Sequence, residues 1–198
     1  MHVFINDREV GALEATSATV GEMVEALGVH VDPNEIVTHV ELDGVSFSAG
    51  EEERWSRRAA SGVKRLTLAT ATPAAFAQAM RAELAVALDV IAAKVDLVVE
   101  RFGTGEDRDA NTLLAALMEE LRLALVLEQQ VTTLDGVVVG EAAEPVATLA
   151  PVLLEAQERR RWSELGALLV SHLAPALRAW SSAERKVAGT PAEASSVF

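Results

Sequence analysis

The sequence contains no cysteine and no tyrosine, and it has only three tryptophans and five phenylalanines. Without cysteine, the chain can form no disulfide, no thiolate metal site and no cysteine nucleophile. Because aromatic residues are scarce, Leu, Val and Ala must fill most of any core. Half of the residues are nevertheless hydrophobic, which predicts a packed globular chain and excludes wholesale disorder.

Long apolar runs are also absent. The most apolar stretch, residues 84–99, is interrupted by Asp89, Lys94 and Asp96, so it is too short and too charged to span a bilayer. The first ten residues, MHVFINDREV, lack the charged segment and apolar segment of a signal peptide. We therefore expect a soluble protein of the cytoplasm.

Positive charge is in short supply. The chain has 17 Lys and Arg against 30 Asp and Glu, which gives a formal net charge of −13. Such a surface repels nucleic-acid phosphates and anionic lipids, so we expect neither nucleic acid nor membrane as a partner. A basic protein partner would be steered towards it, although the same charge also serves solubility alone.

Residues 1–72 are predicted to form a small domain of five short strands and one helix. Alternation of apolar and polar residues indicates strands at residues 2–5, 10–13, 36–42, 45–47 and 63–68. Thr19 and Glu22 form a capping box at the start of the helix. Gly28 is expected to end that helix in a left-handed conformation. This order of elements resembles the β-grasp (ubiquitin-like) fold.

The resemblance has an implication for function. Sulfur carriers and conjugated modifiers of the β-grasp fold end in an exposed Gly-Gly. Here residues 68–72 lead directly into a predicted helix, and neither that point nor Phe198 carries a Gly-Gly. The resemblance therefore implies binding, through the exposed sheet face or a sheet edge.

Residues 73–189 are predicted to form an all-helical domain, so the fold class is α+β. Thr72 suits the N-cap and Pro73 the first helical position. Apolar residues spaced by three or four predict a long helix over residues 74–102. A second helix is predicted over residues 109–134.

Two further helices complete a four-helix bundle. The third starts near Glu144 and is expected to bend or break at Pro151. The fourth covers residues 162–180, with a kink expected at Pro175. Residues 190–198 are small and polar and are predicted to be a disordered tail.

The last predicted helix carries a second resemblance. Its pattern is Trp162-x-x-Leu165-x-x-Leu168-Leu169-x-x-x-Leu173-x-Pro175-x-Leu177-x-x-Trp180. This pattern is similar to the closing helix of a set of uncharacterised bacterial proteins, which place a similar N-terminal domain before an all-helical half. The resemblance implies the same layout and brings no activity with it.

We find no motif that predicts catalysis, a cofactor or a metal ion. His172 follows Ser171, but adjacent helical residues point about 100° apart and do not face each other. His172 is better explained as a partly buried side chain that bonds a carbonyl freed by Pro175. His39 and Glu41 share a strand face, but no third metal ligand accompanies them.

The second predicted helix is apolar on more than one side, which indicates either burial on several sides or a partner-binding surface. We therefore predict a non-enzymatic protein–protein interaction module, such as an adaptor, chaperone-like or assembly protein, that dimerises through its helical domain. The alternative is a sensor for a small molecule or metal, with a bundle cavity near His172. The predicted partner-binding surface consists of Leu114, Met118, Leu123, Val126, Leu127, Trp162 and Trp180.

Overall fold

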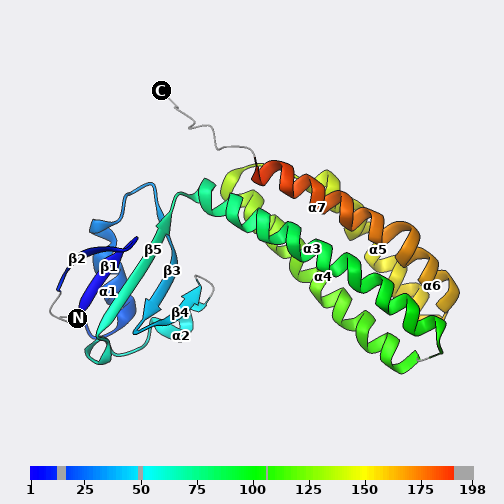
Figure 1. Ribbon diagram of the computed structural model, residues 1–198, viewed down its shortest axis with the longest axis horizontal. Coiled ribbons are helices and arrows are strands. Elements are labelled where there is room, and N and C mark those ends of the chain that lie inside the picture. The colour runs from blue at the N-terminus through cyan, green and yellow to red at the C-terminus, as the bar shows by residue number, and fades with distance from the viewer. Residues whose placement is uncertain (13–16, 49–50, 106, 190–198) are drawn as a thin grey trace. The chain divides into compact units, whose positions relative to one another are not determined.

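The computed structural model describes residues 1–12, 17–48, 51–105 and 107–189. The chain divides into two compact units, Met1–Phe76 and Ala77–Phe198. The first is a mixed five-stranded sheet with a short helix, and the second consists of about four helices (Figure 1). The predicted α+β class is confirmed. The tail predicted at residues 190–198 lies outside the described residues.

Five strands form the sheet of the N-terminal unit. They are β1 (His2–Ile5), β2 (Arg8–Ala12), β3 (Ile36–Leu42), β4 (Val45–Ser48) and β5 (Arg65–Ala71). The sheet order is β2-β1-β5-β3-β4; β1 and β5 pair in parallel, and the other neighbours are antiparallel. The turns Asn6-Asp7 and Asp43-Gly44 have positive φ at both positions, as two-residue hairpin turns require.

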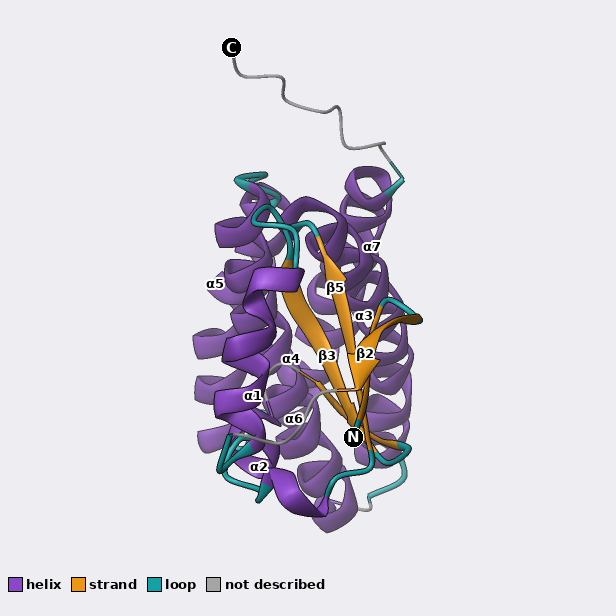
Figure 2. Ribbon diagram, turned by 90° about the vertical axis from the view of Figure 1, so that its left-hand side faces the viewer, coloured by secondary structure: helices purple, strands orange, loops and turns teal. Residues whose placement is uncertain are grey.

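Helix α1 (Val20–Leu27) packs against one face of this sheet (Figure 2). The Thr19 hydroxyl accepts a hydrogen bond from the Glu22 amide, and the Glu22 carboxylate accepts one from the Thr19 amide. The predicted capping box is therefore confirmed. The prediction that Gly28 takes a left-handed conformation is wrong. Its φ is −54°, and the chain continues as a 3-10 turn, η1 (Gly28–His30).

A one-turn helix, α2 (Glu52–Trp55), and a 3-10 turn, η3 (Ala60–Gly62), occupy the segment between β4 and β5. This segment is tied to the start of α1, because the Gly21 amide donates to the Ser56 carbonyl at 2.9 Å. A Cβ atom at Gly21 would lie 3.1 Å from that carbonyl oxygen. Glycine thus allows the backbones of α1 and the α2 segment to approach closely.

The helical unit contains α3 (Pro73–Gly103), α4 (Asp107–Asp135) and α5 (Gly140–Glu158), followed by a longer interrupted helix. That last helix consists of α6 (Trp162–Leu168), a π-helical turn η4 (Leu169–Leu173) and α7 (Ala174–Ala188). Thr72 accepts a hydrogen bond from the Ala75 amide, which confirms the predicted N-cap of α3. One apolar core takes side chains from all of these helices.

The two prolines inside helices act differently. Pro151 does not break α5, which continues through it to Glu158. Proline removes one backbone hydrogen bond there, but Val146 and Leu153 on either side of it remain buried in the core. Pro175 follows the π turn, in which the Ala174 amide donates to the carbonyl of Leu169, five residues back. The irregularity predicted at Pro175 is therefore present as a widened turn.

Candidate functional site

An exposed apolar stripe runs along α3. Val86 and Val90, near its middle, are 60% and 51% exposed. The spacing of these residues repeats every eleven residues, which is close to three turns of an α-helix. The stripe therefore runs nearly parallel to the helix axis. Its exposed positions are Ala79, Ala82, Val86, Val90, Ala93 and Leu97.

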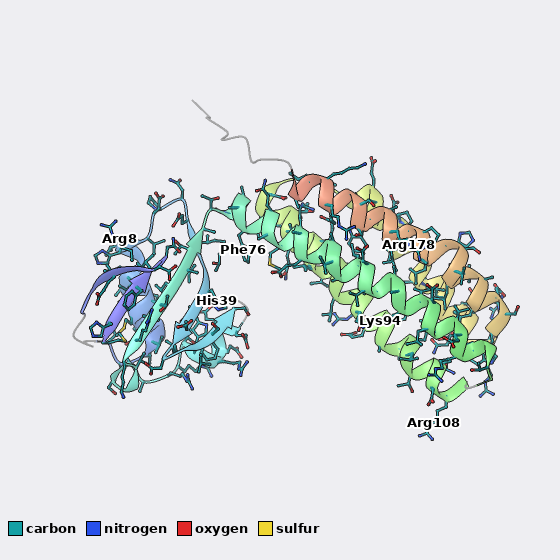
Figure 3. The ribbon with its side chains drawn as sticks, viewed as in Figure 1. Arg8, His39, Phe76, Lys94, Arg108 and Arg178 are labelled. Carbon is teal, nitrogen blue, oxygen red and sulfur yellow. The ribbon has the colours of Figure 1, made fainter. Side chains whose placement is uncertain are left out.

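Helix α4 continues this apolar surface. Lys94, labelled in Figure 3, has its Nζ 2.5 Å from Glu120 Oε1, which places the C-terminal half of α3 beside the middle of α4. A short connection joins the two helices, so they run antiparallel, and Val90 and Leu123 each lie about one turn from this ion pair. The exposed apolar residues that α4 adds are Leu123, Val126 and Leu134. We call the stripe together with these three residues the α3–α4 face.

The α3–α4 face carries few charges. Its nine side chains are apolar, and Lys94 and Glu120 pair with each other towards one end of it. The exposed Glu83, one turn before Val86, is the acidic residue of α3 that borders it. The whole chain, in contrast, carries a net charge of −13.

The seven residues of the predicted partner-binding surface do not share one surface. Leu123 and Val126 are exposed and belong to the α3–α4 face. Leu114 and Trp180 are buried in the core, so neither is accessible to a partner. The remaining three residues pack against the same core and are partly buried: Met118, Leu127 and Trp162. Much of the apolar width of α4 is thus used for packing inside the unit.

A buried ionic cluster joins α3, α4 and α7. The side chains of Arg81 and Glu184 have no exposed surface, and that of Asp135 is 8% exposed. Arg81 donates to the two carboxylate oxygens of Asp135 at 2.8 and 3.0 Å and to Glu184 at 2.7 Å. It also donates to the Val137 carbonyl at 2.7 Å, and Trp180 Nε1 donates to Glu184 at 2.8 Å.

Burial disfavours the charged forms of Arg81 and Asp135, but their hydrogen bonds outweigh this effect. Desolvation acts to lower the pKa of Arg81, but hydrogen bonds to Asp135 and Glu184 raise that pKa above its ordinary value. Desolvation acts to raise the pKa of Asp135, but the hydrogen bonds from Arg81 and the Val137 amide lower it. Both groups therefore stay charged at neutral pH, and neither is poised to exchange a proton in a reaction.

This cluster was not predicted, although the sequence contains a signal for it. Arg81 stands three residues before Leu84, on the apolar side of α3, and Glu184 stands one turn after Trp180, on the apolar side of α7. Charged residues of opposite sign at core positions of two helices indicate a buried ion pair, because either one alone would be costly to bury.

His172 lies at the surface of the helical unit, so the prediction that its side chain is partly buried is wrong. It is exposed and borders an open hollow of about 390 Å³, which is also lined by Glu141, Glu144 and Leu149. Its neighbours Leu169 and Leu173 are completely buried and fill the core beneath. In the part of the chain that the structure describes, no three His, Asp or Glu residues are placed to hold a metal ion.

Comparison with known proteins assigns no function to the chain, so a function has to be inferred from its own surfaces. The chain matches no family model, no curated protein and no solved structure. Within the described ranges, no helix combines the length and apolar composition that crossing a membrane requires. The α3–α4 face is the feature of the helical unit that most directly indicates an activity.

Proposed function

We propose that the protein is a non-enzymatic interaction module that self-associates through the α3–α4 face. The observation that carries the proposal is the row of exposed apolar side chains on two adjacent helices. On α3 alone this row is roughly 27 Å long. Exposed apolar surface of this extent is unfavourable in water and is typical of interaction sites.

A second copy of the chain is the partner that fits this face. Two copies that each carry −13 repel one another over most of their surfaces. They can meet with less repulsion where charges are few, as on the α3–α4 face, beside which Lys94 and Glu120 neutralise each other. The small side chains of the stripe allow two helices to approach closely, and a face that meets itself forms a closed, symmetric dimer.

The N-terminal unit fits this proposal as a β-grasp-like binding domain. Its sheet order, its parallel β1–β5 pair and its single helix on one face support that assignment. A dimer of the helical unit would carry two such domains, and paired binding domains gain avidity for a partner with two sites. This arrangement suits an adaptor or an assembly protein.

Sedimentation velocity over a concentration series tests self-association of the full chain. We expect the wild-type chain to form a dimer. The double substitution Val86→Glu and Val90→Glu should yield a monomer, because it places carboxylates of both copies at the centre of the interface. A matched control is Val152→Glu, which changes an exposed valine of α5 outside the face and should leave the dimer intact.

Two results would count against the proposal. One is a wild-type chain that stays monomeric over the whole concentration series. The other is a dimer that persists in the Val86→Glu, Val90→Glu variant while circular dichroism shows that the variant is folded.

A further inference from the structure

A groove of about 300 Å³ lies between α1 and α2 in the N-terminal unit. Three of its lining residues are acidic, namely Glu22, Glu25 and Glu52, and Arg57 is the one basic lining residue. Trp55 also lines the groove. An acidic wall beside an aromatic ring is the chemistry that recognises an ammonium or guanidinium group.

Two of the three carboxylates are available to a ligand. Glu22 is already engaged, because it accepts hydrogen bonds from the amides of Ala18 and Thr19. Glu25 and Glu52 are exposed and form no ion pair with any residue in the described ranges. Neither carboxylate is therefore held in an ion pair in the free protein, and with Glu22 they outnumber Arg57, the one basic lining residue.

Trp55, a lining residue of the groove, has an unused hydrogen-bond donor. The residue is 6% exposed, and its Nε1 is buried without a hydrogen-bond partner among the described residues. The indole of Trp180, in contrast, donates to Glu184. A buried N–H group without an acceptor is unfavourable, so a ligand that brings an acceptor gains affinity by pairing with it.

We propose that this groove binds a basic segment of a partner protein. A Lys or Arg side chain places its cation between Glu25 and Glu52 and against the Trp55 indole, and a peptide carbonyl of the same segment accepts from Trp55 Nε1. A peptide fits better than a polyamine, because a protonated polyamine has no acceptor to offer. The helix α2 is a single turn, so a small shift of it can admit the carbonyl.

The long-range charge of the chain supports the same partner. A net charge of −13 attracts basic segments and speeds their encounter with the protein. The groove adds the short-range selectivity that net charge lacks, because it combines two carboxylates, an aromatic ring and one N–H donor. This proposal is independent of self-association through the α3–α4 face.

An NMR titration of the full chain, labelled with ¹⁵N at the tryptophan indoles, tests the proposal. Trp55→Phe assigns the Trp55 signal, because it removes that indole N–H. The probe is an acetylated and amidated peptide that contains Arg and Lys separated by glycines. We expect the Trp55 indole proton to move downfield and to saturate, while the signals of Trp162 and Trp180 stay in place.

Substitutions in the groove separate specific binding from general attraction to an acidic protein. Glu25→Gln and Glu52→Gln should each weaken peptide binding by about two- to fivefold, as expected for loss of one exposed charge contact. Glu53→Gln is the matched control, because Glu53 is exposed next to Glu52 but does not line the groove. It should leave the affinity unchanged.

Three outcomes would overturn the proposal. The first is a Trp55 signal that does not move with the peptide. The second is equal affinity in Glu25→Gln, Glu52→Gln and Glu53→Gln. The third is a spermidine titration that moves the Trp55 signal as far as the peptide does, since charge alone would then account for the effect.

Discussion

Arg81 is the side chain whose replacement should most disturb the helical unit. It makes four hydrogen bonds, which reach Asp135, Glu184 and the Val137 carbonyl. A buried ionic cluster of this kind contributes little net stability compared with an apolar core, but it is very sensitive to the loss of one partner. Its structural consequence is that α3, α4 and α7 must meet at one place.

The substitution Arg81→Met should lower the free energy of unfolding of the helical unit by about 3–5 kcal/mol, because it leaves buried carboxylates without a cation. Urea unfolding followed by circular dichroism measures this loss. The matched control is Arg122→Met, which removes an exposed arginine paired with Glu119. It should cost far less, because solvent screens this exposed pair.

A second variant keeps this prediction testable if Arg81→Met does not fold. Adding Glu184→Gln removes one stranded charge, and the new amide can still accept a hydrogen bond from Trp180 Nε1. The double variant should therefore be more stable than Arg81→Met alone. If Arg81→Met costs no more than Arg122→Met, the cluster does not have the role described here.

At the scale of elements, helix starts depend on local hydrogen bonds. The Thr19 hydroxyl caps α1 by accepting from the Glu22 amide. Thr19→Ala should destabilise the N-terminal unit by about 1 kcal/mol, measured as faster hydrogen exchange of the α1 amides. In Thr133→Ala the change should be small, because the Thr133 hydroxyl donates to the Gln129 carbonyl of its own helix. Equal effects of the two substitutions would contradict the capping role.

Elements were predictable where their cause is local. The caps at Thr19 and Thr72 and the spacing of apolar residues all act within a few residues. Gly28 and Pro151 show the limit, because the first takes an ordinary helical conformation and the second is held in α5 by buried neighbours. Neither the conformation of Gly28 nor the continuity of α5 at Pro151 follows from the adjacent residues in the sequence.

The candidate sites depend on contacts between segments that are distant in the sequence. For this reason they were less predictable than the helices and strands. The apolar width of α4 is visible in the sequence, but only the packing of the other helices decides that Leu114 is buried and Leu123 exposed. The groove beside Trp55 exists because the α2 segment approaches α1 at Gly21. A single sequence gives no direct sign of that approach.

At the scale of the whole molecule, net charge acts in opposite ways on the two proposed interactions. Self-association brings together two chains of −13, whereas the groove attracts a cation. Raising the ionic strength shortens the range of both effects, from about 30 Å at 0.01 M salt to about 8 Å at 0.15 M. Repulsion and attraction are both screened.

Added salt should therefore strengthen the dimer and weaken binding of the basic peptide. Sedimentation equilibrium at low and at physiological NaCl measures the first, and the NMR titration repeated at both concentrations measures the second. The two dissociation constants should move in opposite directions. A shift of both in the same direction would show that net charge does not govern both interactions.

Arg81 lies 54 residues before Asp135 and 103 residues before Glu184 in the chain. The ribosome therefore makes this cation long before it makes the second carboxylate that neutralises it. A chain that stops before residue 184 retains an arginine at a core position without that partner, and its helices cannot close over the charge without a large cost. We therefore expect a chain that ends before residue 184 to pack its helices less completely and to stay more accessible to proteases.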